Sequence, residues 1–325
     1  MSGAVDHNAV FRTYHNYLRA IDRYLRLTYG REDDLFLHLA EAFSTMPTSG
    51  RIKKVSVDGR VERSLRQAWA TEVFIHHQSE TAASAEVISC ANLWATVQAY
   101  YSVFHAAQAV IQGSRWWNSP PDSHAGTLKL LSEATSRPIF PPPFDAFCKG
   151  PIDTCTFGGM LRGVAITNTN SLAVPTDHDC HERIGLLLKT TRERQIAEVK
   201  QKWIDSRENR KPQGGKYRRV PAFHQAKIAE RIPATTLFDF LYRFRIRSNY
   251  RDAEAFLLGA GGQSEGMAFN EALINYLQAT LFVLELVLSR IMGVDELVSS
   301  AKGFMEAVGD PAERTVGARL PYLYV

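Results

Sequence analysis

Four arginines crowd one short stretch of the chain, RFRIRSNYRDAEAF, which spans residues 243–256. On a helix, Arg243, Arg247 and Arg251 would share one stripe with Asp239, since side chains four residues apart are neighbours. Asp239 could pair with Arg243, which would leave two cations that repel each other and favour a bound anion such as a phosphate. The alternative is that acidic residues of the same stretch, or carbonyl groups at a helix end, neutralise the arginines.

A second stretch, YYSVFHAAQAV at residues 100–110, places a histidine beside tyrosines and alanines. With helical spacing, Tyr100, Phe104 and Ala107 form a core-facing side, and His105 falls on the adjacent stripe. A histidine in that position either packs against the core or takes part in chemistry. Which of the two applies depends on whether His105 faces Arg247.

Arginine, asparagine and histidine together could cleave RNA. In this interpretation, Arg247 holds the scissile phosphate and Asn249 orients the 2′-hydroxyl. A histidine from another helix, His105 or His124, would act as the acid or base.

A third cluster of charge lies between Lys189 and Arg219, where 11 lysines and arginines face 4 acidic residues. The formal net charge of the whole chain is only +4, so this segment holds its positive excess. Such a segment suits a polyanion, and Trp203 and Tyr217 could stack on bases. The alternative is a solvated basic helix and loop. Besides Arg243 and Arg251, the candidate nucleic-acid contacts are Lys200, Lys202, Arg207, Arg210, Lys211, Arg218 and Arg219.

The sequence favours neither a metal centre nor a membrane span. The four cysteines form no C-x-x-C pair, and DHDCHE at residues 177–182 has poor spacing for chelation, so no metal or cofactor is expected. The apolar run Ala279–Met292 is shorter than the roughly 20 residues of a bilayer span and predicts a buried helix. Since the N-terminal residues lack a signal-peptide pattern, a cytoplasmic location is expected.

Apolar spacing predicts a mainly helical protein. Helices are expected in the first 45 residues, over 82–113, from about 179 to 210, over 235–258 with a bend near Asn249, and over 266–292. RIKKVSVDGRVE, residues 51–62, resembles a short hairpin. The β-branched segment GVAITNTNSLAV, residues 163–174, predicts a strand within an inserted segment.

Four segments in this order resemble the HEPN superfamily of helical bundles: SAEVISCANLWATVQAYYSVFHAAQAVI, SHAGTLKLLSE, TTLFDFLYRFRIRSNYRDAEAF and EGMAFNEALINYLQATLFVLELVLSRIM. The resemblance covers less than half of the chain. It implies an all-α bundle that dimerises and belongs to prokaryotic toxin-antitoxin, phage-defence or RNA-processing systems, often as a metal-independent endoribonuclease. The family's arginine, followed four to six residues later by histidine, is missing from RFRIRSNYRDAEAF.

The expected organisation follows from these segments. Residues 1–80 would form an N-terminal helical region with the hairpin, 81–136 and 234–293 the two halves of the bundle, 137–233 an insertion with the basic helix, and 294–325 a C-terminal tail. The expected function is RNA binding, with or without metal-free cleavage, in a prokaryotic defence or toxin-antitoxin system. The alternative is a non-catalytic subunit that dimerises or binds nucleic acid within a larger complex. A homodimer and a partner protein encoded with it are expected.

Overall fold

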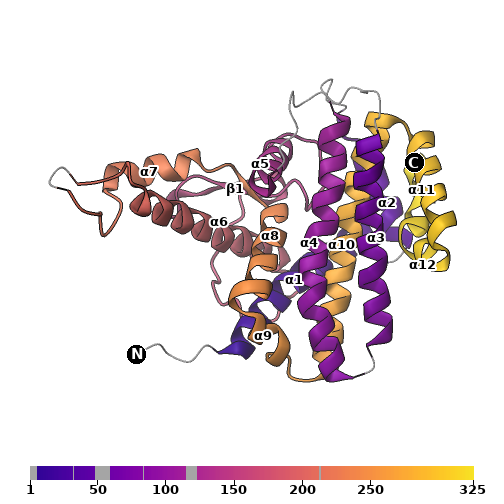
Figure 1. Ribbon diagram of the computed structural model, residues 1–325, viewed down its shortest axis with the longest axis horizontal. Helices are drawn as coiled ribbons and strands as arrows, with labels where there is room; N and C mark the ends of the chain where they lie inside the picture. The colour runs from indigo at the N-terminus through magenta and orange to yellow at the C-terminus, as the bar shows by residue number, and fades with distance from the viewer. Residues whose placement is uncertain (1–5, 32, 48–58, 83, 115–122, 212–213) are drawn as a thin grey trace.

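Three long helices that lie side by side form the body of the molecule (Figure 1). The computed structural model describes residues 6–31, 33–47, 59–82, 84–114, 123–211 and 214–325. The fold is mainly α-helical with one small sheet, so the predicted fold class is confirmed. The body helices are α3 (Gly59–Thr81), α4 (Ala85–Gly113) and α10 (Gln263–Met292).

The N-terminal helices cover this body. They are α1 (His7–Tyr29) and α2 (Asp33–Ser44). Their apolar residues at helical spacing are buried: Phe11, Tyr14, Leu18, Ile21, Leu25, Leu35, Leu39 and Phe43. Most of the expected hairpin at 51–62 lies outside the described residues, and its last residues, from Gly59, form the first turn of α3 instead.

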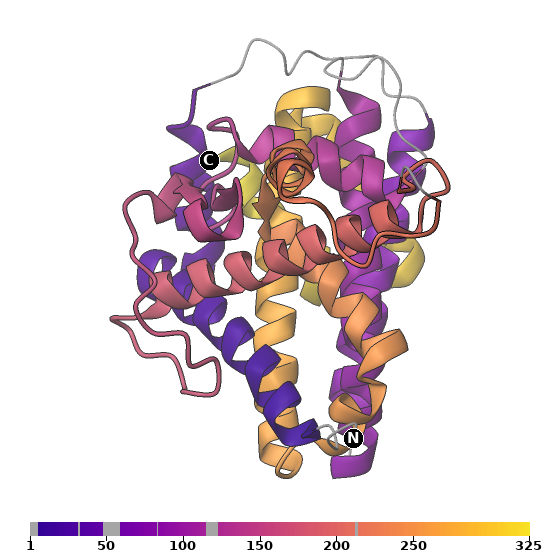
Figure 2. The ribbon, with the colours of Figure 1, turned by 90° about the vertical axis from the view of Figure 1, so that its left-hand side faces the viewer.

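The inserted segment forms an arm that projects sideways from the body (Figure 1). Seen from that side, its longest helix lies across the bundle (Figure 2). The segment contains β1 (Phe147–Lys149), β2 (Thr156–Gly158), α6 (Cys180–Asp205) and α7 (Ala222–Arg231); α5 (His124–Thr135) precedes it and β3 (Thr235–Thr236) follows it. The strands form an antiparallel sheet in the order β2-β1-β3, so the beginning and the end of the insertion pair with each other.

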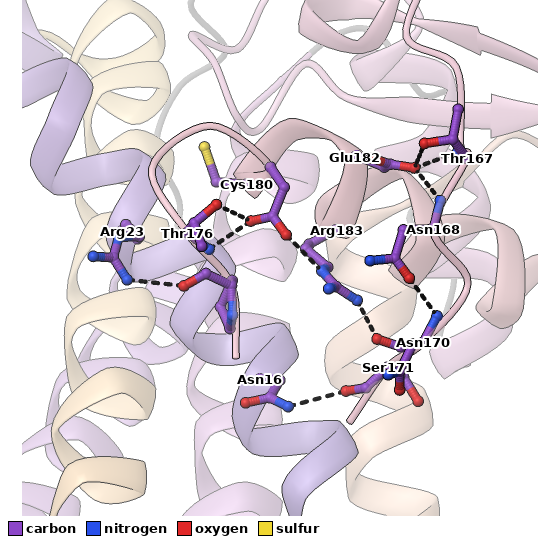
Figure 3. Close-up of polar contacts among 12 residues, drawn as sticks. Asn16, Arg23, Thr167, Asn168, Asn170, Ser171, Thr176, Cys180, Glu182 and Arg183 are labelled. Carbon is purple, nitrogen blue, oxygen red and sulfur yellow. Dashed lines mark hydrogen bonds and ion pairs between the residues drawn. The ribbon is translucent and has the colours of Figure 1, made fainter. Parts of the chain in front are cut away.

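The predicted strand at 163–174 is wrong, because this segment is an irregular strap. Its backbone groups bond to side chains rather than to a neighbouring strand (Figure 3). The Glu182 carboxylate accepts from the backbone N–H groups of Thr167 and Asn168, and Asn16 of α1 donates to the Ser171 carbonyl at 3.0 Å. Local side-chain bonds of this kind compete with strand pairing, which β-branched composition alone does not reveal.

One buried arginine holds the base of the arm together. Arg192 of α6 is fully buried and its guanidinium donates to backbone carbonyls. The acceptors are Gly150 at 2.5 Å, Pro233 at 2.9 Å and Ala229 at 2.9 Å, with Cys148 at 3.4 Å. These carbonyls belong to both ends of the insertion, so a single side chain holds the two ends together.

The chain returns to the body through a helix that bends, as the sequence predicts. Helix α8 (Leu237–Ile246) passes into a π-helical turn, η3 (Arg247–Arg251), before α9 (Ala253–Leu258). Thr236 and Asp239 form a capping box at the start of α8, in which each side chain bonds to the other residue's backbone N–H. The predicted bend near Asn249 is therefore confirmed, and a π turn produces it.

The C-terminal segment is folded onto the body rather than extended as a tail. It comprises α11 (Val294–Val308), α12 (Asp310–Ala312), η4 (Glu313–Gly317) and η5 (Leu320–Tyr324). Arg319 is completely buried and donates to both Glu72 of α3 and Glu285 of α10 at 2.5–2.9 Å. Burial alone would lower the pKa of Arg319, but the two carboxylates reverse this effect and raise it. Residues from all five expected segments share one hydrophobic core.

Helix α10 contains the apolar run 279–292. At 30 residues, α10 is the one helix of the described residues that is long and apolar enough to cross a membrane. The run itself is shorter than a bilayer span, but the helix that contains it is not. The prediction of a buried helix holds, because 83% of its most apolar window is buried inside the fold. The cytoplasmic location stays a prediction.

The buried triad predicts a large loss of stability in Arg319→Met. The variant leaves Glu72 and Glu285 buried without their cation, so we expect the free energy of unfolding to fall by roughly 3–5 kcal/mol. Denaturant unfolding measures this change. The matched control is Arg314→Met, which breaks the exposed pair between Arg314 and Glu80 and should change stability by less than about 1 kcal/mol. Equal effects of the two substitutions would contradict the role of the triad.

Candidate functional site

The strongest candidate site surrounds Arg245, where α8 meets α4. The Arg245 guanidinium carbon lies 4.9 Å from the ring centre of Tyr101, 5.5 Å from that of Tyr100 and 5.9 Å from that of Tyr242. Its Nη2 donates to the Tyr101 hydroxyl at 2.9 Å, while its Nε is buried without a hydrogen-bond partner. No carboxylate of the described residues forms an ion pair with Arg245. The cation is therefore held by aromatic rings and keeps its capacity to bind an anion.

Two histidines complete this cluster. His124 begins α5, and its Nδ1 lies 2.7 Å from the Tyr100 hydroxyl, with its ring 5.8 Å from that of Tyr101. The ring of His105 stacks on Tyr101 at 6.5 Å and meets Phe104 edge-on at 5.5 Å. Both imidazoles are only partly buried, so both can be reached from solvent. We call Tyr100, Tyr101, His105, His124, Tyr242 and Arg245 the arginine–histidine cluster.

The electrostatics of the cluster keep both imidazoles neutral near pH 7. Burial, and then the positive charge of Arg245, lower the pKa of His124. Burial, and then His124, lower the pKa of His105. Burial raises the pKa of Tyr100, so its hydroxyl stays protonated, and it lies within hydrogen-bonding distance of Nδ1 of His124. In the tautomer that accepts from Tyr100 at Nδ1, Nε2 of His124 carries the proton and is a donor, as neutral imidazole has one donor and one acceptor nitrogen.

Local sequence explains how these groups reach their places. Ser123 caps α5, because its hydroxyl accepts from the Gly126 N–H at 3.1 Å, and this fixes the helix start that presents His124. The alanines of YYSVFHAAQAV are buried, and small residues let a neighbouring helix approach closely. The capping box of α8 fixes the helix that presents Tyr242 and Arg245.

The structure does not bring Arg247 and Asn249 to His105, so the predicted trio is not assembled. Arg247 forms an ion pair with Asp252, which was the alternative interpretation of the arginine stretch. Ser248 contacts Thr96, nine positions before His105 on α4, which places this turn roughly 13 Å from His105 along the axis. The arginine that faces the histidines is Arg245.

Arg243 also differs from its predicted role. Asp239 does not pair with Arg243, because its carboxylate bonds to Thr236 at the helix cap and to Gln195 at 2.8 Å. Arg243 instead donates to the hydroxyl of Thr190 at 2.9 Å and to that of its neighbour in α6. Burial raises the pKa of Asp239 to about 6. The side chain of Arg251 lies outside the described residues.

The basic segment divides into structural and exposed charges. Arg192 holds the base of the arm together, while Lys216 pairs with Asp205 and Lys200 donates to Gln225 at 3.1 Å. Arg210 is half-buried, with its backbone bridged to Lys216. The exposed candidates are Lys202, Arg207, Lys211, Arg218 and Arg219. The Trp203 ring lies 5.4 Å from that of Tyr217 and 5.2 Å from that of His224, so these rings pack mainly on one another.

Side chains that could bind a metal ion do not gather into a site within the part of the chain that the structure describes. No group of three or more His, Cys, Asp or Glu side chains there could hold a metal ion. In DHDCHE, the Cys180 thiol lies 3.7 Å from Nδ1 of the adjacent His181, and burial raises the pKa of that thiol.

Sequence reasoning missed Arg245, Tyr101 and Tyr242 as site residues. The spacing of two of these residues could have indicated the site, because Tyr242 and Arg245 are three residues apart and share a helix face. Counting by four from Asp239 selected Arg243 and Arg247 and passed over the arginine between them.

Comparisons with known proteins identify no relative. No protein-family model matches the chain, and neither a curated protein nor a solved structure matches it.

The cluster predicts that the pKa of His124 depends on Arg245. In Arg245→Gln, removal of the positive charge should raise the pKa of His124 toward the ordinary histidine value, with burial still keeping it somewhat lower. Titration of the imidazole resonances by NMR measures the change.

The control is Arg247→Gln, which removes a cation already paired with Asp252 and should leave the pKa of His124 unchanged. A similar rise in both variants, or none in Arg245→Gln, would show that Arg245 does not act on this imidazole.

Proposed function

We propose that the protein binds RNA and cleaves it without a metal ion at the arginine–histidine cluster. The observation that carries this proposal is a guanidinium with no carboxylate partner among the described residues, held over tyrosine rings beside two neutral imidazoles. Such a cation suits a phosphate, and a neutral imidazole suits the removal of a hydroxyl proton. The resemblance of the sequence to the HEPN superfamily agrees with this chemistry, with a different arginine and a histidine from another helix.

The proposed reaction is transfer of a phosphate ester within the RNA chain. His105 takes the proton of the 2′-hydroxyl, and the 2′-oxygen attacks the phosphorus as the bond to the 5′-oxygen breaks. The His105 imidazolium then returns the proton to the departing 5′-oxygen, and its lowered pKa makes it a better acid. The products are a 2′,3′-cyclic phosphate and a 5′-hydroxyl. Arg245 and Nε2–H of His124 stabilise the charge that develops on the phosphate oxygens.

The exposed cations of the arm supply the second part of the proposal. Lys211, Arg218 and Arg219 lie in the connection between α6 and α7, all exposed. Contacts from such residues to phosphates are independent of sequence and weaken with salt. The arm therefore holds RNA, while the cluster acts on it. A homodimer and a role in defence are further expectations from the resemblance.

Cleavage of end-labelled RNA in EDTA tests the cluster. Arg245→Ala should lower the rate about 10²–10³-fold, the typical effect of removing one group that stabilises a developing oxyanion. The matched control, Arg247→Ala, removes an arginine of the same helical region that is engaged by Asp252, and should cleave nearly as fast as the wild type.

Each other result has a definite meaning for the cluster. Loss of cleavage in Arg247→Ala alone would show that the catalytic arginine is Arg247, in the π-helical turn, and not Arg245. RNA that is retained but never cleaved would leave an RNA-binding protein without catalysis, the alternative function. Far-UV circular dichroism must show that each variant is folded.

Salt dependence tests the arm. In the triple variant Lys211→Glu, Arg218→Glu and Arg219→Glu, the slope of log affinity for single-stranded RNA against log salt should fall by about 2, since each lost phosphate contact contributes about 0.7. Filter binding between low and physiological salt measures the slope. The control exchanges Lys302 and Arg314, cations of the C-terminal helices, for glutamate. An unchanged slope in the triple variant would remove the arm from the interface.

A further inference from the structure

A large cavity lies where the arm meets the body, beside the arginine–histidine cluster and outside the proposed reaction. Its volume is about 1090 Å³, and its walls come from α5, α6, α7 and α8. Leu128, Val199, Ile228 and Ile246 make much of the wall apolar. Ligand sites in proteins have this character, in which an apolar wall carries a few polar groups.

The carboxylates of the cavity already have partners within the protein, whereas several of its cations do not. Its three carboxylates are engaged: Glu198 with Arg194, Asp205 with Lys216, and Asp239 with Gln195 and the α8 cap. Its exposed cations have no carboxylate partner among the described residues: Lys129, Lys202 and Arg231. The cavity also includes Arg243, whose Nε is buried without a hydrogen-bond partner. The charge of the cavity that is not compensated by a partner is therefore positive.

Two aromatic side chains line the same cavity, Trp203 from α6 and Tyr242 from α8. Both are half-buried, so part of each ring is open to a ligand. An aromatic ring is a sequence-tolerant platform for a nucleobase, because every base has a π face. Lysine and arginine supply the donors that phosphate oxygens require.

We propose that this cavity binds a free nucleotide, with its base against the Tyr242 ring and its phosphates at Lys202. The inference goes beyond the proposed function, because the cavity lies on the arm side of α8 and the reaction does not use it. The two sites share one residue, Tyr242, whose ring lies 5.4 Å from that of Tyr100 and 6.4 Å from that of His124. A bound nucleotide would therefore contact the wall that positions the cluster.

Isothermal titration calorimetry of the full chain with AMP and ATP tests this proposal. The wild type should bind at least one nucleotide, and Lys202→Ala should weaken that binding about tenfold by loss of one charge-assisted contact. Val199→Glu should abolish it, because the substitution places a negative charge on the cavity wall. Both positions are exposed, so the variants should fold. The control is Lys227→Ala, a cation of α7 that lies over the exposed Phe223 ring and does not line the cavity.

The ligand class and the location are tested by further titrations. Inorganic phosphate and decanoate should bind more weakly than the nucleotide, since each offers only the anion or an apolar chain without a planar ring. Tighter binding of decanoate would assign the cavity to an amphiphilic acid and overturn the proposal. Arg245→Ala should still bind the nucleotide, whether or not RNA is cleaved by the wild type. Binding that survives Val199→Glu but is lost in Arg245→Ala would place the nucleotide at the cluster, and absence of binding to the wild type would also overturn the inference.

Discussion

Burial of the Arg192 guanidinium is the constraint on which the structure of the arm depends. A charged group without access to water is tolerated only where hydrogen bonds replace its hydration. Arg192 meets this requirement with carbonyl groups from both ends of the insertion, which also pair as strands β1 and β3. The two ends of the arm are therefore held together at its root. Ile232, Pro233 and Ala234, which belong to that root, line the cavity between α6 and α8.

Three buried or half-buried arginines of this protein are satisfied in different ways. Carbonyls satisfy Arg192, and two carboxylates satisfy Arg319. Arg245 has tyrosine rings and one hydroxyl instead. Cation–π contacts contribute about 0.5–2 kcal/mol each and leave the charge uncompensated, so an anion at this position would gain a strong partner. That unequal treatment is the physical basis for placing the site at Arg245.

Much of the fold could be predicted from the sequence, because apolar spacing reports burial directly. The core residues of α1, such as Phe11 and Leu18, and the bend near Asn249 are examples. The candidate site could be predicted only as a region. Grouping residues four positions apart cannot show which arginine faces α4, because that depends on the rotation of α8 and on the capping role of Asp239. The strap at 163–174 was misjudged because the bonds to Glu182 are invisible in composition.

The most direct test of the account is cleavage of matched RNA and DNA oligonucleotides of the same sequence by the wild-type protein in EDTA, with analysis of the product ends. Attack by a 2′-hydroxyl at the arginine–histidine cluster predicts that RNA is cut to a 2′,3′-cyclic phosphate and a 5′-hydroxyl, while DNA stays intact. Intact RNA, equal cleavage of DNA, or RNA products that end in a 3′-hydroxyl and a 5′-phosphate would contradict it.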